Sequence, residues 1–193
     1  MSETLNEPST VTYAIDGQDR LIHVDESWSA FAESNEGGRT LRPESVIGRS
    51  LWEYIRDPQL QMCYKRLLEI VRGSDRPLDF EFRCDSPLFQ RHMRMTMRRE
   101  NNECVTFECS TEQTIRQKAI VRIAAGSSVG KSCKRCSLCN LFQIEEDVWG
   151  EADELVQRCK VMNRPTPPTI IWTVCPGCRD RMSTLAASRS QSA

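Results

Sequence analysis

The sequence has no long hydrophobic run and no excess of charge of either sign. No stretch of about 18 apolar residues occurs, so no membrane-spanning helix is predicted. The N-terminal segment lacks both the basic start and the apolar run of a secretory signal. Lysine and arginine number 26 against 27 acidic residues, which leaves no overall charge to attract nucleic acid or an anionic membrane. We therefore expect a soluble, cytoplasmic protein.

Histidine is scarce, and recognisable catalytic groupings are missing. The two histidines, His23 and His92, fall in strand-like segments and are best interpreted as ordinary polar positions. We find no nucleophile–base pair and no paired-carboxylate motif. The sequence therefore predicts a protein that is not an enzyme.

Cysteine, in contrast, is abundant, with 10 residues in the chain. A reducing cytosol disfavours a disulfide framework and favours metal or redox roles. Two Cys-x-x-Cys pairs stand out, Cys136 with Cys139 and Cys175 with Cys178. Two such turns supply the four ligands of tetrahedral zinc, and four cysteines leave no open position for a water molecule. The spacing predicts a structural zinc site.

Other interpretations of these cysteines stay open. The sequence Cys-Pro-Gly-Cys, from Cys175 to Cys178, also occurs in redox dithiols. The triple Cys-x-x-Cys-x-x-Cys that begins at Cys133, taken with Cys175 and Pro176, has the spacing of some iron–sulfur ligand sets. A metal-free module is a further alternative. Cys133 is a candidate extra thiol or alternative ligand.

Residues 11–111 alternate between strand-like and helical patterns. A strand is predicted over residues 20–25, and a short helix follows it. Residues 59–73 place apolar side chains on one helical face before a glycine. Three strand-like runs come next: LDFEFRC, RHMRMTMRR and CVTFEC. They predict an antiparallel meander.

This order of elements resembles the PAS domain family. The motifs VIGRSLWEYIRDP and FRCDSP, followed by RHMRMTM, resemble the corresponding segments of small bacterial PAS-like proteins that end in a paired Cys-x-x-Cys module. In those proteins a tryptophan follows the first cysteine pair, as Trp149 does here. The resemblance implies an α+β fold: a PAS-like antiparallel sheet with flanking helices, plus a small zinc-stabilised module of zinc-ribbon or treble-clef type.

The resemblance also implies a concave pocket that binds a ligand of unknown identity or is filled by the domain's own side chains. An axial histidine for haem and the flavin-binding motif of light sensors are both missing from the expected positions. The candidate pocket residues, which equally suit an ordinary core, are Phe80, Phe82, Met93, Met95 and Met97.

The sequence divides into five predicted parts. These are a disordered N-terminus (1–10), the PAS-like domain (11–111), a linker (112–132), the four-cysteine zinc module (133–185) and a disordered tail (186–193). Within the module, we expect a helix that carries Trp149, Leu155 and Cys159 on one face, a strand over TIIWTV, and a second helix that begins near Cys178.

Together these features predict a sensing or interaction protein in signal transduction. Its output would be a contact with a protein partner or with itself, and the resemblance implies a homodimer. One rival is a nucleic-acid-binding regulator that uses a basic patch around the metal: Lys131, Lys134, Arg135, Arg179 and Arg181. Acidic residues on the same module argue against this rival. A thiol-redox sensor is a third possibility.

Overall fold

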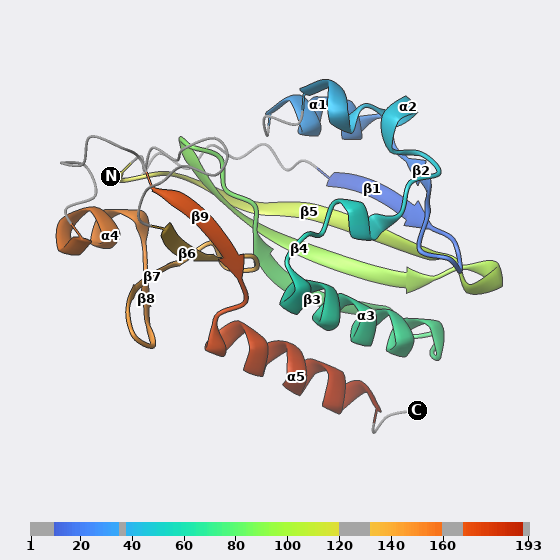
Figure 1. Cartoon of the computed structure of the whole chain (residues 1–193). Coiled ribbons are helices and arrows are strands. Elements are labelled where there is room, and N and C mark those ends of the chain that lie inside the picture. Colours follow the sequence, from blue (N-terminus) through green and yellow to red (C-terminus); the bar gives the residue numbers. More distant parts are fainter. Residues whose placement is uncertain (1–9, 35–37, 120–131, 160–167, 191–193) are drawn as a thin grey trace.

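The computed structural model describes residues 10–34, 38–119, 132–159 and 168–190. It is an α+β structure, as the sequence predicted, and it contains two sheets that are both rich in antiparallel pairs (Figure 1). Most of the predicted N-terminal extension and the second half of the predicted linker lie outside the described residues.

The first sheet has five antiparallel strands in the order β2-β1-β5-β4-β3. The predicted meander is confirmed, because β3, β4 and β5 are neighbours in that order. Met93, Met95 and Met97 alternate along β4 and are all buried, so this face of the sheet forms the core. The strands are β1 (Thr10–Ile15), β2 (Leu21–Val24), β3 (Leu78–Arg83), β4 (Phe89–Arg99) and β5 (Val105–Arg116).

Helix α3 (Pro58–Arg72) packs on this buried face. Asp57 caps its first turn by accepting a hydrogen bond from the backbone N–H of Gln59, and Pro58 suits the first helical position. Its buried stripe consists of Tyr64, Leu67, Leu68 and Val71. Shorter elements precede it: α1 (Ser27–Ser34), α2 (Pro43–Val46) and the 3-10 turns η1 (Gly38–Leu41) and η2 (Leu51–Glu53).

The second sheet has four strands in the order β8-β7-β6-β9. Its strands are β6 (Ser132–Cys136), β7 (Phe142–Glu145), β8 (Val148–Gly150) and β9 (Thr169–Thr173). β6 and β9 run parallel, whereas the other pairs are antiparallel. Helix α4 (Ala152–Cys159) buries Ala152 and Leu155 against Phe142 and Ile144. The predicted helix around Trp149 was too long, because Trp149 belongs to β8 and pairs with Gln143.

Helix α5 (Pro176–Ser190) lies alongside α3 and joins the two sheets into one core (Figure 1). Leu138, Val174, Met182 and Ala186 belong to the same buried cluster as the side chains of the first sheet and α3. The two cysteine turns and α5 therefore share one apolar core with the five-stranded sheet, whereas the cluster of Phe142, Ile144, Ala152 and Leu155 is separate.

Two predicted boundaries were wrong. β5 continues to Arg116, past the predicted domain end at residue 111, because the early residues of β4 give it a pairing partner: Phe89 lies opposite Arg116. Residues 186–190 belong to α5 and not to a disordered tail. The helix continues because Ala186, with 7% of its surface exposed, packs into the shared core.

Candidate metal centre

The first cysteine pair lies in the turn between β6 and β7. The backbone N–H of Asn140 donates to the carbonyl of Cys136, and that of Leu138 donates to the Cys136 sulfur at 3.4 Å. Asn140 closes the turn with a φ of 60°, a left-handed conformation that asparagine adopts more easily than most residues. The turn thereby directs Cys136 and Cys139 to the same side.

The second pair follows β9 and begins α5. Pro176 is the first residue of the helix, and the backbone N–H of Cys178 donates to the Cys175 sulfur at 3.4 Å. The backbone N–H of Cys175 donates to the Cys136 sulfur at 3.4 Å and so connects the two turns. The expectation that Cys178 lies in the first turn of a helix is confirmed.

The four sulfur atoms of Cys136, Cys139, Cys175 and Cys178 all lie within 4.8 Å of one another. The sulfurs of Cys139 and Cys175 are 3.7 Å apart. A tetrahedral ion with zinc–sulfur bonds of about 2.3 Å separates its ligands by roughly 3.8 Å, so the cluster has the dimensions of a metal site. Cys136, Cys175 and Cys178 are buried, which shields the site from water.

The cluster also perturbs its own protonation. Hydrogen bonds from the thiols of Cys139 and Cys178 lower the pKa of Cys136. Donation to Cys136 in turn raises the pKa of Cys139 to about 12 and raises that of Cys178. The thiols of Cys139 and Cys178 therefore both donate toward the Cys136 sulfur, and a bound divalent cation would displace their protons.

Cys133 lies apart from this group. It is on β6 opposite Ile170 and packs with it against the apolar cluster beneath α4. Among the described residues, the set of potential ligands consists of the two Cys-x-x-Cys pairs and does not include Cys133.

A buried ionic cluster joins the cysteine module to the first sheet. The Arg83 guanidinium at the end of β3 contacts Asp85 at 2.6 Å and Glu151 at 2.6 Å. The Arg83 and Asp85 side chains are 9% and 1% exposed, so this pair is largely removed from water. Arg135 of β6 approaches Asp85 at 3.4 Å. Burial lowers the pKa of Arg83, but the hydrogen bonds that Arg83 donates to Asp85 and Glu151 outweigh it and raise the pKa overall.

The turn that carries the first cysteine pair is hydrogen-bonded to the backbone of Arg83 in β3. The N–H of Arg83 donates to the carbonyl of Leu138 at 2.7 Å, and the Asn140 amide donates to the carbonyl of Arg83 at 2.6 Å. The Ser137 hydroxyl donates to Asp57, the residue that caps α3, at 2.6 Å. β3 and α3 thus hold this turn from two sides.

An apolar cavity of about 260 Å³ lies in the five-stranded part of the protein. Of the predicted pocket residues, Phe82, Met93 and Met95 line it. Phe80 and Met97 are buried in the core and are not among the lining residues. The lining also includes side chains that were not predicted from the sequence: Tyr13, Trp28, Phe31, Ala32, Tyr64, Cys84 and Cys109. Trp28, Phe31 and Ala32 are spaced three and four residues apart, as on one face of a helix, and this spacing is the signal that could have identified them.

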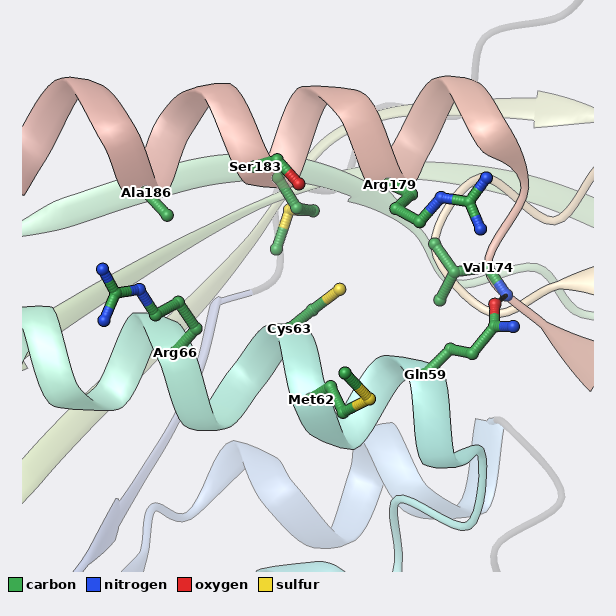
Figure 2. A pocket seen from close by; sticks show the side chains of 9 residues that line it. Gln59, Met62, Cys63, Arg66, Val174, Arg179, Ser183 and Ala186 are labelled. Carbon is green, nitrogen blue, oxygen red and sulfur yellow. Dashed lines mark hydrogen bonds between the residues drawn. The ribbon is translucent and has the colours of Figure 1, made fainter.

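A second hollow, of about 390 Å³, runs between α3 and α5 beside the cysteine cluster. Figure 2 shows Cys63 on α3 pointing into this groove, with Arg66 toward one end and Arg179 toward the other. Val174 and Arg179 belong to its lining and directly neighbour the ligands Cys175 and Cys178 in the chain.

Two arginines of the predicted basic patch, Arg135 and Arg181, are bonded to other parts of the protein, whereas Lys134 and Arg179 are exposed. Arg135 is packed over Phe142 and Trp172, with its guanidinium carbon 4.8 and 5.5 Å from the ring centres, and it is bonded to Asp85. Arg181 donates to the backbone carbonyl of Glu81. Lys131 lies outside the described residues.

The chain matches no protein-family model and no curated protein. In the described part of the chain, every helix is too short or too polar to cross a membrane.

Replacing Arg83 tests the ionic cluster. We expect Arg83→Met to reduce the free energy of unfolding by about 3 kcal/mol, because it leaves the Asp85 carboxylate buried without its main partner. Arg94→Met is the matched control, since Arg94 forms its ion pairs on the exposed face of neighbouring β4 and should cost much less. Urea denaturation measures both. Equal losses for the two variants would contradict the assignment.

Proposed function

We propose that the protein is a PAS-like sensing and interaction module with a structural zinc centre and no enzymatic activity of its own. Two observations support this proposal. The described elements follow the order on which the PAS resemblance rests: two strands, short helices, a longer helix and three antiparallel strands. The cavity adjoins that sheet and is lined almost entirely by apolar and aromatic side chains, which suits a small apolar ligand.

Zinc is the metal that the four cysteines favour. Four thiolates in a tetrahedral arrangement suit zinc or iron–sulfur chemistry, and two Cys-x-x-Cys turns are the usual ligand set of structural zinc. Such a centre has no open coordination position, so its role is to hold together the turn after β6 and the start of α5. Stabilisation of the local fold is the chemistry that the ion would supply.

The observation that carries the proposal is the position of β3 and the residue after it. Phe82 and Cys84 line the cavity, and Arg83 between them binds the cysteine-bearing turn through its backbone and Glu151 through its side chain. Successive side chains of a strand point to opposite faces, so one short segment contacts both the cavity and the module. A ligand that shifted this segment would shift the cysteine turn as well. We infer that the module converts occupation of the cavity into a changed contact with a protein partner or a second copy.

Metal analysis tests the zinc assignment. Protein purified without added metal should contain one zinc ion per chain and show no visible absorption band. Cys178→Ser should lose the zinc, whereas Cys133→Ser should retain it, because Cys133 packs against the cluster beneath α4. A broad visible band, as iron–sulfur clusters and haem give, would contradict the zinc assignment.

The sensing role can be tested with indole as a small aromatic probe. Cavities of roughly 150 Å³ bind benzene, so the larger cavity here should bind indole. Ala32→Trp should abolish binding by filling the cavity, whereas Ala30→Trp, at an exposed position on the same helix, should not. Isothermal calorimetry measures the binding.

The transmitted effect can be followed in the same protein by amide hydrogen exchange. Indole should change the exchange of the turn from Ser137 to Asn140, and Arg83→Met should weaken that response. If indole fails to bind, or binds without any effect on the turn, the sensing proposal is wrong while the zinc assignment stands.

A further inference from the structure

β9 forms an exposed edge of the second sheet. It pairs with β6 on one side, and none of the described residues pairs with its other side. The segment from Thr169 to Val174 contains no charge, and Ile171 and Trp172 are 48% and 47% exposed. An exposed, uncharged and strongly β-forming edge is a template for pairing with another strand.

The other described sheet edges are protected in the ways that soluble proteins use. β8 has three residues and lies next to the acidic residues Glu145 and Asp147. β3 carries Asp79 and Glu81. β2 is covered by a loop, since the backbone N–H of Leu21 donates to the carbonyl of Arg49. β9 carries no charged residue of its own that would protect its edge, and this favours a partner strand at this edge.

The backbone of β9 identifies which groups face outward. The carbonyl of Thr173 accepts from the N–H of Ser137 just after β6, so Thr173 directs its polar groups inward. The direction alternates along a strand, and Ile171 therefore also faces β6. Ile170 and Trp172 consequently present their N–H and C=O groups at the open edge.

We propose that the occupant of this edge is β9 of a second copy of the chain, paired antiparallel about a twofold axis at Ile171. In this register, Ile170 of each copy lies opposite Trp172 of the other and exchanges two backbone hydrogen bonds with it. Ile171 faces its own counterpart on the twofold axis. The result is a continuous sheet of eight strands, four from each copy.

The neighbouring symmetric registers are poorer. Centring the pair on Ile170 places Trp172 opposite Pro168, which has no N–H to donate. Centring it on Trp172 places Ile170 opposite Val174, whose N–H already donates to the side chain of Gln59 at 3.2 Å. The register centred on Ile171 uses every outward group of Ile170 and Trp172 in both copies.

The side chains also suit self-pairing. Aromatic and β-branched residues directly opposite each other stabilise antiparallel pairs, and the Ile170–Trp172 pair occurs twice. No like charges meet, because the strand has none. Arg135 packs against the Trp172 ring and so restricts it before association. This inference deepens the proposed interaction role by naming its partner and surface, but it does not require the cavity to bind a ligand.

Disulfide trapping with Ile171→Cys tests the register. Residues on the twofold axis of this pairing have Cα atoms about 4.5 Å apart, within the range that a disulfide spans. Lys134→Cys is the matched control, because Lys134 lies beside Ile171 on the next strand inward and is also exposed. The two Lys134 positions would be about 14 Å apart, too far for a disulfide.

With metal-loaded protein under mild oxidation, we expect a covalent dimer for Ile171→Cys and little more than the wild-type background for Lys134→Cys. Sedimentation velocity should show a wild-type dimer that Ile171→Glu converts to a metal-loaded monomer. A monomeric wild type, or equal cross-linking at both positions, would overturn the inference. Zinc content and indole binding of that monomer would still test the proposed function separately.

Discussion

The rest of the structure depends on the attachment of the first cysteine turn to the end of β3. Arg83 binds Asp85 and Glu151 through its side chain and the turn through its backbone, in a region largely closed to water. Ionic groups in such a place are stable only while each has its partner. The cluster therefore helps to fix where the module lies on the sheet, and in that position α5 packs along α3.

The four-cysteine cluster was the part of the protein that the sequence predicted best. Two Cys-x-x-Cys turns dictate their own local geometry, so the spacing identified Cys136, Cys139, Cys175 and Cys178, and the structure brings their sulfurs together. Helix α3 and the strands β3 to β5 were equally predictable, because their apolar periodicities are long and regular. The alternation of Met93, Met95 and Met97 was enough to identify the buried face of β4.

The sequence was least informative where distant segments meet. Arg83 and Glu151 are far apart in the chain, and each looks like an ordinary surface charge until the fold places them in contact. The same holds for the end of β5, which depends on where β4 begins, and for residues 186–190, whose composition suggested fraying but whose Ala186 is buried. The lining of the cavity was only partly predicted, because it combines side chains from all five strands of the first sheet with others from α1, α3 and the short turns between them. The local pattern of apolar residues determines which segments form helices and strands. Contacts between distant segments determine where those elements end and which side chains line the surfaces between them.

The central claim is that the cysteine centre and the five-stranded sheet form one cooperative unit. Urea unfolding can test it in a variant with Trp149→Phe and Trp172→Phe. In this variant the remaining tryptophans, Trp28 and Trp52, lie in the part of the protein built on the five-stranded sheet, so their fluorescence reports on that part alone. Metal release to a chromogenic chelator is recorded in the same samples. The account predicts that fluorescence and metal release change at the same urea concentration. Metal release at clearly lower urea, with the Trp28 and Trp52 signal still native, would contradict it.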